Sequence, residues 1–195
     1  MNRYFIVYKP YKMISQFVSP YPEQRLLGDL DFDFPEGTHA VGRLDNDSEG
    51  LLILTTDKTI VRRLLHPDRL HLRRYFVYVE NVPSPETISQ LCEGIDILVK
   101  KRGLYLTKSC DVKLLEKNPD IPERDPPFIE YRPHAWLEFN LVEGKNRQIR
   151  KMCKAVRHEC KRLVRVSIED LDLTGMKPGD VREMQEDEFI AKLKL

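Results

Sequence analysis

The sequence predicts an α+β protein, because β-rich runs and amphipathic helical patterns both recur along its 195 residues. Strand patterns are clearest at Tyr4–Tyr8, Arg74–Val79 and Trp136–Val142, and in the last of these apolar and polar residues alternate. Apolar residues at helical spacing cover Lys58–Leu65 and Asn146–Val156. Neither an internal repeat nor a linker divides the chain, so we expect a single domain.

The other elements follow from local signals. The first strand stops at Lys9-Pro10, and the proline-rich stretch 19–38 predicts a loop with one short helical turn. Leu51–Leu54 is a short apolar run that predicts a buried strand. Ser84 and Pro85 form the start signal of a helix that ends at Gly94. The remaining patterns predict one or two strands in Leu104–Leu115, an irregular proline-rich loop at about 117–134, a strand over Arg165–Leu173, a turn at Met176–Asp180 and a terminal helix over Glu186–Leu195.

The charge distribution points to a polyanionic partner. The net charge is only +1, but residues 144–165 hold nine of the 32 basic residues and one of the 31 acids. On the predicted helix at Asn146–Val156, the basic residues share one face and the apolar residues the other. Such a concentrated basic stripe is typical of nucleic-acid binding. A second, looser basic group between Lys58 and Arg74 is equally compatible with a solvated face.

Composition also restricts the cellular setting. No run has the length of a membrane span, and the first nine residues lack the apolar core of a secretory signal, so we expect a cytoplasmic protein without a membrane partner. The four cysteines form no Cys-x-x-Cys pair, which favours free thiols. No phosphate loop, dinucleotide fingerprint or metal-ligand set is present, and we therefore expect neither a cofactor nor a metal.

The stretch from Gly42 to Asp57 combines a polar loop with the buried strand that follows it. Within it, Asp45, Asp47 and Glu49 lie close enough to repel one another, so the fold must supply a cation or use the charge. Their spacing imitates the first half of a calcium-binding loop, but position twelve is Thr56 where a bidentate Glu is needed. Turn hydrogen bonds are the simplest role for Asp47 and Glu49.

The motif Gly-Arg-Leu-Asp followed by Ser-Glu-Gly-Leu-Leu resembles the signature of the pseudouridine synthases that act on single sites in bacterial ribosomal RNA. The resemblance implies that Asp45 is the catalytic residue. It also implies that Arg43 enters the space left by an extruded nucleotide, although Arg43 could equally pair with the neighbouring acids. Many relatives carry a small RNA-binding domain upstream, whereas this chain starts directly at the strand that ends in Lys-Pro, as the minimal members do.

A second motif, Glu-Gly-Lys-Asn-Arg-Gln-Ile-Arg at 143–150, resembles the C-terminal motif of the same family. There the last Arg, here Arg150, pairs with the catalytic Asp, and a fixed guanidinium would keep a buried carboxylate ionised. Tyr75 matches the family tyrosine that lies against the target base, and a core tyrosine is the alternative. The resemblance continues to residues 165–179 and so covers nearly the whole chain.

The resemblance implies one catalytic domain over residues 1–195, with the pseudouridine synthase fold of a mixed, mainly antiparallel sheet, flanking helices and an RNA-binding cleft. The implied activity is isomerisation of uridine to pseudouridine in ribosomal RNA, or in a pre-ribosomal particle, by a monomer. Transfer RNA as the target, a non-catalytic ribosome-assembly factor and a carboxylate-dependent hydrolase are the alternatives. Besides Asp45, Tyr75 and Arg150, we expect the RNA to contact Lys9, Arg43, Lys145, Asn146, Arg147, Gln148, Lys151 and Lys154.

Overall fold

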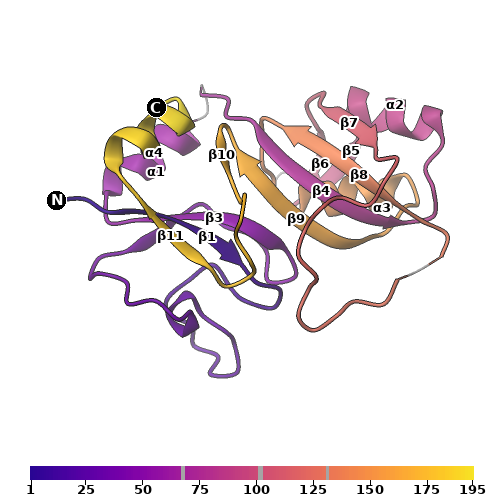
Figure 1. Cartoon of the computed structure of the whole chain (residues 1–195). Helices are drawn as coiled ribbons and strands as arrows, with labels where there is room; N and C mark the ends of the chain where they lie inside the picture. Colours follow the sequence, from indigo (N-terminus) through magenta and orange to yellow (C-terminus); the bar gives the residue numbers. More distant parts are fainter. Residues whose placement is uncertain (67–68, 101–102, 131) are drawn as a thin grey trace. The chain divides into compact units, whose positions relative to one another are not determined.

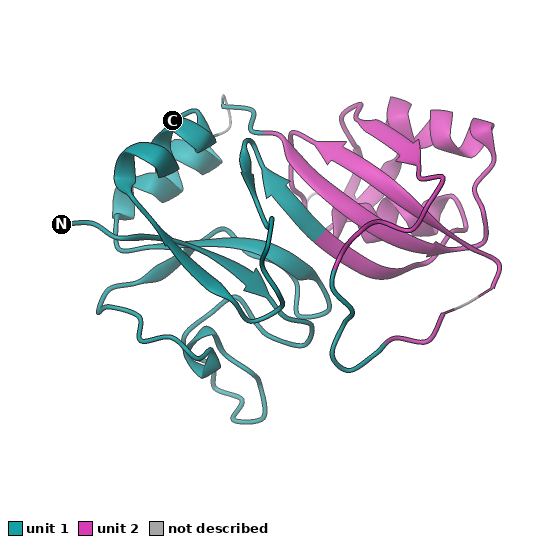
Figure 2. Cartoon of the chain, viewed as in Figure 1, with its two compact units in different colours: residues 1–71, 122–127, 165–195 teal, residues 72–121, 128–164 magenta. Residues whose placement is uncertain are grey.

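The computed structural model describes residues 1–66, 69–100, 103–130 and 132–195, and it confirms the α+β class (Figure 1). The chain forms two compact units (Figure 2). Unit 1 comprises Met1–His71, Pro122–Pro127 and Arg165–Leu195, and unit 2 comprises Leu72–Ile121 and Phe128–Val164.

Unit 1 is built on a sheet with the strand order β11-β1-β3-β9. Its elements are β1 (Tyr4–Lys9), a 3-10 turn (Leu27–Asp29), β2 (His39–Val41), β3 (Glu49–Thr55), α1 (Lys58–Leu65), the residues of β9 (Cys160–Ile168) from Arg165 onward, β10 (Leu171–Asp172), β11 (Val181–Met184) and α4 (Glu186–Leu193). Strand β1 pairs antiparallel with both β3 and β11, and every residue of β1 and β3 is buried. The two strands therefore form the apolar centre of the unit.

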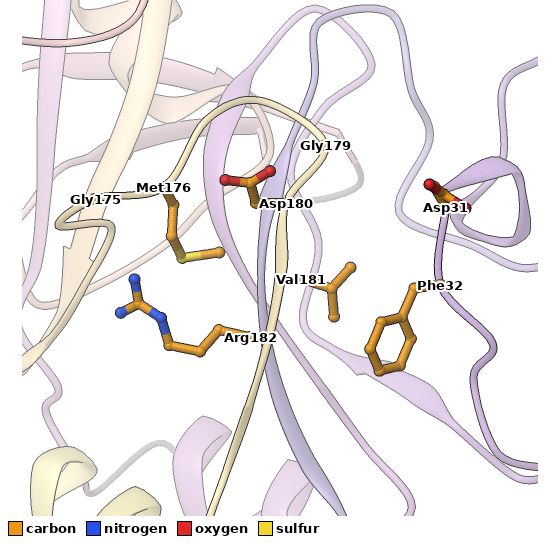
Figure 3. A pocket seen from close by; sticks show the side chains of 8 residues that line it. All are labelled: Asp31, Phe32, Gly175, Met176, Gly179, Asp180, Val181 and Arg182. Atoms are coloured by element: carbon orange, nitrogen blue, oxygen red, sulfur yellow. The ribbon is translucent and has the colours of Figure 1, made fainter.

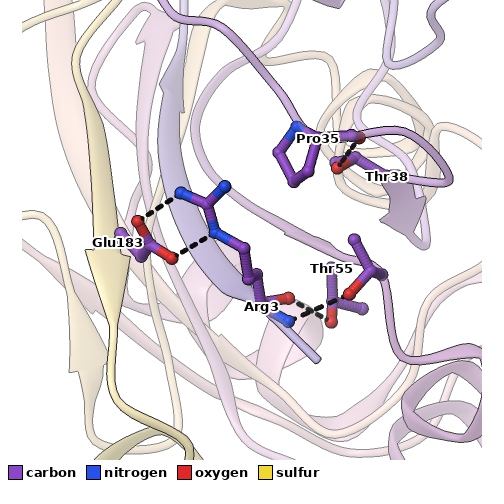
Figure 4. A network of polar contacts seen from close by, with 6 residues as sticks. Arg3, Pro35, Thr38, Thr55 and Glu183 are labelled. Carbon is purple, nitrogen blue, oxygen red and sulfur yellow. Dashed lines mark hydrogen bonds and ion pairs between the residues drawn. The ribbon is translucent and has the colours of Figure 1, made fainter. Parts of the chain in front are cut away.

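The start of the chain is fixed to both neighbours of β1 (Figure 4). The Arg3 guanidinium donates to both carboxylate oxygens of Glu183 at 2.6 and 2.7 Å, and its main-chain N–H donates to Thr56 Oγ1 at 2.9 Å. The Thr55 hydroxyl in turn donates to the Arg3 carbonyl at 2.7 Å. In the core of the unit, Phe5 contacts the rings of Phe32 and Phe34.

Unit 2 is built on a sheet with the strand order β9-β4-β8-β7. Its elements are β4 (Arg73–Glu80), α2 (Pro85–Glu93), β5 (Asp96–Val99) and β6 (Gly103–Leu106), which form a separate two-stranded sheet, β7 (Asp111–Leu114), β8 (His134–Leu141), α3 (Gln148–Ala155) and the residues of β9 up to Val164. The alternation in β8 is confirmed, with Leu137, Phe139 and Leu141 buried and Glu138 and Asn140 partly exposed. The buried face packs with Ile149, Met152 and Cys153 of α3 in one core cluster.

Most predicted elements are confirmed. The strands at residues 4–8, 51–54, 74–79 and 136–142, the helices at 58–65 and 186–195, and the two strands within 104–115 are all present. Ser84 caps α2 by accepting the Thr87 N–H, and Gly94 ends that helix. Within residues 117–133 of the proline-rich loop, the described positions contain no helix or strand, and His134 already belongs to β8.

Three predictions of element boundaries are wrong. The strand expected over Arg165–Leu173 is two antiparallel strands, β9 and β10, because the chain turns at Glu169, whose φ of +49° is left-handed. Strand β9 also starts earlier, at Cys160. The helix expected from Asn146 begins at Gln148, because Arg147 is left-handed at φ +54°. The division into two compact units was not predicted, and the single catalytic domain stays a prediction.

Candidate functional site

The loop that carries Asp45 lies in unit 1 and runs into β3. Asp45 is half-buried, and its carbonyl accepts the Ser48 N–H at 3.0 Å, which closes a tight turn. On the side before Asp45, the Ser15 hydroxyl donates to the Leu44 carbonyl and accepts the Leu44 N–H, both at 3.0 Å. On the side after it, the Lys12 N–H donates to the Asn46 carbonyl at 2.9 Å. The main chain is thus held on both sides of the candidate carboxylate.

Lys9 is a buried basic residue close enough to the three acids of this loop for their charges to raise its pKa. Its side chain is fully buried, and Nζ donates to the Pro10 carbonyl at 2.9 Å and the Met13 carbonyl at 2.6 Å. Burial lowers the pKa of the Lys9 ammonium to about 7, against the opposing fields of Glu49, Asp47 and Asp45. The ammonium therefore faces inward, and Lys9 is not among the residues that we propose to contact RNA.

The entry of β3 has room only for glycine. Gly50 pairs with Lys9 across the sheet, and its φ of +109° is left-handed. A Cβ at this position would lie 2.2 Å from the Arg165 carbonyl oxygen, well inside contact distance. Arg165 itself is buried and donates from Nε to the Leu51 carbonyl at 2.8 Å. This close approach fixes the direction in which the Asp45 loop enters β3.

In unit 2, Glu143 organises the second motif. Its Oε1 accepts the Lys108 N–H at 2.9 Å and the Gln148 side-chain amide at 2.7 Å, and its Oε2 accepts the Tyr105 hydroxyl at 2.7 Å. Burial alone would raise the pKa of Glu143, but these hydrogen bonds and the nearby Lys145 charge lower it overall. The carboxylate is therefore a fixed anion at the start of the basic segment.

Gln148 links the Glu143 carboxylate to the main chain of Lys145. Its Oε1 accepts the Lys145 N–H at 2.8 Å, while its own N–H donates to the Lys145 carbonyl at 3.0 Å. The side chain is only 4% exposed, so its contacts are internal, and we do not place it on the RNA either. Lys145 Nζ lies 4.8 Å above the Tyr105 ring and 3.7 Å from Glu143. Its position is thus set by a ring and a carboxylate.

The other polar residues between Asn146 and Lys154 differ in exposure. Asn146, Arg147 and Lys154 are exposed and Lys151 is partly exposed, as a surface that binds a polyanion requires. Arg150 is different, because one guanidinium nitrogen donates to the Cys160 carbonyl at 2.9 Å and reaches Cys160 Sγ at 3.6 Å. Arg150 is therefore oriented by β9, which suits a positioning role better than a mobile phosphate contact.

Tyr75 and Arg43 complete the predicted set. Tyr75 lies in β4 opposite Phe139 of β8 and is 8% exposed within the core cluster of unit 2. Arg43 is exposed on the loop of unit 1. The predicted residues therefore fall in both units, with Asp45, Arg43 and Lys9 in unit 1 and Tyr75 and the residues of α3 and its preceding loop in unit 2. The pairing of Arg150 with Asp45 and the contact of Tyr75 with a base stay predictions.

Sequence reasoning missed the residues that support the site. Glu143 was part of the quoted motif, and an acid within a basic run was the available signal for its role. Ser15 binds the main chain of Leu44, which is 29 residues away in the sequence, and no local sequence pattern predicts that contact. A cavity of about 400 Å³ in unit 1 was also not predicted (Figure 3). Its eight lining residues, among them Phe32, Met176 and Arg182, include none of the predicted site residues.

Within residues 1–66, 69–100, 103–130 and 132–195, no three His, Cys, Asp or Glu side chains are grouped to hold a metal ion. Nor does any helix in those ranges combine the length and apolar character needed to span a membrane. All four cysteines are free thiols, as expected.

The fold and the two ordered motifs define a class of protein. Residues 3–155 match the family model of RNA pseudouridylate synthases, and the chain belongs to that family. It is 39% identical to the ribosomal large subunit pseudouridine synthase E of Xanthomonas axonopodis pv. citri over 173 aligned residues. The alignment covers 87% of this chain and 87% of the relative. It is 30% identical to the ribosomal large subunit pseudouridine synthase B of Bacillus subtilis, over 93% of this chain and 67% of the relative.

Solved structures agree on the fold. A crystal structure of a pseudouridylate synthase superimposes with a TM-score of 0.79 over 99% of this chain and 74% of the other, at 23% identity. The predicted pseudouridine synthase fold is therefore confirmed. The family and the named relatives make this enzyme an isomerase.

Proposed function

We propose that this chain isomerises a uridine of large-subunit ribosomal RNA to pseudouridine, with Asp45 as the catalytic carboxylate. The observation that carries the proposal is the half-buried Asp45 on a loop whose main chain is hydrogen-bonded on both sides, within the family signature. Reactive groups need such fixed geometry, because small misplacements reduce the rate strongly. The names of the relatives support large-subunit ribosomal RNA as the substrate.

In the proposed mechanism the target uridine leaves its stack and enters the site, at a cost of roughly a few kcal/mol. The bond between uracil N1 and the sugar C1′ breaks, the base turns, and a new bond forms between C5 and C1′. C5 loses a proton and N1 gains a proton, so the product has the same composition as the substrate. The Asp45 carboxylate assists this exchange at the sugar or the uracil ring.

Other residues hold the reactants. Arg150, oriented by the Cys160 carbonyl, keeps the Asp45 carboxylate ionised and aimed. Tyr75 packs on the base, where an aromatic face replaces roughly 1–3 kcal/mol of lost stacking. The exposed and partly exposed polar residues of the basic segment bind the RNA backbone, and Arg43 takes the space of the extruded nucleotide. This backbone-binding set is Lys145, Asn146, Arg147, Lys151 and Lys154.

A second candidate function is that of a non-catalytic RNA-binding factor. The basic segment favours it, because RNA binding without catalysis would be enough to explain that segment. It requires no carboxylate at position 45. Asp45→Asn therefore separates the two functions, because it removes the charge with little change in size. The cytoplasmic location and the monomeric state stay predictions from the sequence.

The test is tritium release from RNA labelled at carbon 5 of uridine, with large-subunit, small-subunit and transfer RNA as separate substrates. We expect release by the wild type from large-subunit RNA, and a loss of at least about 100-fold in Asp45→Asn. Asp47→Asn is the matched control, because it removes the same charge two residues away and should retain activity. Equal release by Asp45→Asn and the wild type would refute the catalytic role. Release only from transfer RNA would refute the ribosomal substrate.

A further inference from the structure

Part of the proline-rich loop is packed within unit 1, where the Asp45 loop also lies. Residues Pro122–Pro127 belong to this unit. Arg124 places its guanidinium carbon 4.0 Å from the centroid of the Tyr11 ring, and its Nε donates to the Pro126 carbonyl at 3.0 Å. A guanidinium stacked on an aromatic face and held by a hydrogen bond has a defined orientation. The loop is therefore attached at this point.

Tyr11 belongs to the segment that holds the Asp45 loop. Its neighbour Lys12 donates its N–H to the Asn46 carbonyl at 2.9 Å, directly beside Asp45. The carbonyls of Pro10 and Met13, on either side, are the two acceptors of the buried Lys9 ammonium. Lys12 also has a left-handed φ of +55°. A non-glycine residue keeps that conformation only where its surroundings enforce it.

Each step from Arg124 to Asp45 is thus a direct contact or a covalent neighbour. Arg124 covers Tyr11, Tyr11 precedes Lys12, and Lys12 binds the main chain of the residue after Asp45. The Lys12 ammonium also lies 5.8 Å from the Tyr11 ring centroid, so two cations are directed at the same ring. Loss of Arg124 would remove the nearer of these two cations from the Tyr11 ring.

We propose that Arg124 is a positioning residue for the Asp45 site, because its stack on Tyr11 holds the Pro10–Met13 segment against the Asp45 loop. The inference rests on the proposed function in taking Asp45 as the catalytic group. It predicts an effect on the rate of the bound complex more than on RNA affinity, since Arg124 acts through protein contacts. The proline-rich loop then affects the reaction rate although none of its residues contacts the reacting atoms.

The test combines kinetics with hydrogen exchange on the full chain. In Arg124→Ala we expect kcat for pseudouridine formation to fall about 10-fold, with KM for RNA within about twofold of the wild-type value. Tyr11→Ala should cause the same loss, and the double variant should be no slower than either single variant. Tyr11→Phe keeps the ring and should retain activity, and Arg124→Lys should restore part of kcat.

Arg132→Ala is the matched control, because this arginine belongs to the same loop but its side chain is 83% exposed. It should leave kcat, KM and exchange unchanged. The Lys12 amide should exchange at least about 10-fold faster in Arg124→Ala than in Arg132→Ala, because its bond to Asn46 opens more often.

The outcomes separate this inference from the proposed function. A higher KM with unchanged kcat in Arg124→Ala would make Arg124 an RNA contact and overturn the inference. Unchanged exchange at Lys12 would also overturn it, and that measurement needs no substrate. If the wild type turned over none of the RNAs, the proposed function would fail, while exchange at Lys12 would still decide whether Arg124 holds the segment.

Discussion

Gly50 lies so close to the Arg165 backbone that a Cβ at position 50 would be 2.2 Å from the carbonyl oxygen and 2.7 Å from the amide nitrogen. The obstacle is main chain, which cannot rotate away as a flexible side chain can. This contact sets the entry of β3 directly after the Asp45 loop, so that the stability of the sheet and the geometry of the candidate site depend on one position.

Gly50→Ala should therefore destabilise the protein strongly. The left-handed φ alone costs about 1–2 kcal/mol in a residue with a Cβ, and the clash should raise the total to at least about 3 kcal/mol. Gly37→Ala is the control, because its φ of +81° is also left-handed but a Cβ there meets nothing within 4 Å. Urea unfolding compares the two. Losses in the free energy of unfolding that agreed within about 1 kcal/mol would contradict the role of the close contact.

Lys9 should make stability rise with pH above neutrality. Burial lowers its pKa in the folded protein to about 7, whereas a lysine in the unfolded chain titrates near its ordinary value of about 10.4. Between these values the unfolded state binds more protons, so the free energy of unfolding increases with pH, by at most about 1.4 kcal/mol per unit. Below the folded pKa, both states bind the proton and this contribution to the slope ends.

The measurement is urea unfolding from pH 6 to pH 9.5 in the wild type and in Lys9→Met, which cannot titrate. The variant should lack the increase, and Lys58→Met, at an exposed position of the same unit, should keep it. The same pH slope in the wild type and in Lys9→Met would show that Lys9 is protonated in the folded protein throughout this range.

Glu143→Gln should weaken unit 2 in a pH-dependent way. The carboxylate accepts three hydrogen bonds, and an amide can accept at only one of its two terminal atoms, so we expect a loss of about 1–3 kcal/mol in the free energy of unfolding at pH 7. Because the folded pKa of Glu143 is lowered, its stabilisation is present above the unfolded value of about 4.3 and is lost as the pH falls through the folded value.

The difference between the wild type and Glu143→Gln should therefore shrink in acid. Glu93→Gln, an exposed glutamate of α2, serves as the control and should match the wild type at both ends of the range. A difference that stayed constant from pH 7 to below the folded pKa would mean that the charge of Glu143 contributes nothing and that only the shape of the side chain matters.

The elements that the sequence predicted correctly have strong periodicity or clear caps, such as β8 and α2. Strand β5 was missed because Ile97 is buried while Leu98 beside it is 70% exposed, so apolar residues occupy both faces and the alternation disappears. The turn between β9 and β10 was missed because it uses Glu169 in a left-handed conformation, where a glycine or asparagine would have been the usual signal.

For the site, motif resemblance identified the candidate carboxylate, but side-chain direction depends on tertiary packing. Lys9 was expected on the RNA, but its side chain is buried and donates to the carbonyls of Pro10 and Met13, an arrangement that is rare for lysine. Gln148 was also expected on the RNA, although its side-chain amide is bound to Glu143 and to the Lys145 main chain. Such contacts can be predicted only when it is known which segments of the chain lie side by side in the fold.

The exposed cations of the basic segment should contribute to RNA affinity in a salt-dependent way. A cation that neutralises one phosphate releases condensed counterions, and its loss should make the slope of log K against log salt shallower by about 0.7–0.9. We expect this change for Arg147→Ala and for Lys154→Ala, both exposed, measured on ribosomal RNA fragments from 50 to 200 mM salt. Lys113→Ala is the control, because Lys113 is also exposed but lies on β7 with its Nζ 3.0 Å from Asp111. Its removal should leave the slope unchanged. If Lys113→Ala changed the slope as much as Lys154→Ala does, RNA binding would depend on the overall charge of unit 2, and the assignment of the α3 face as the RNA surface would be wrong.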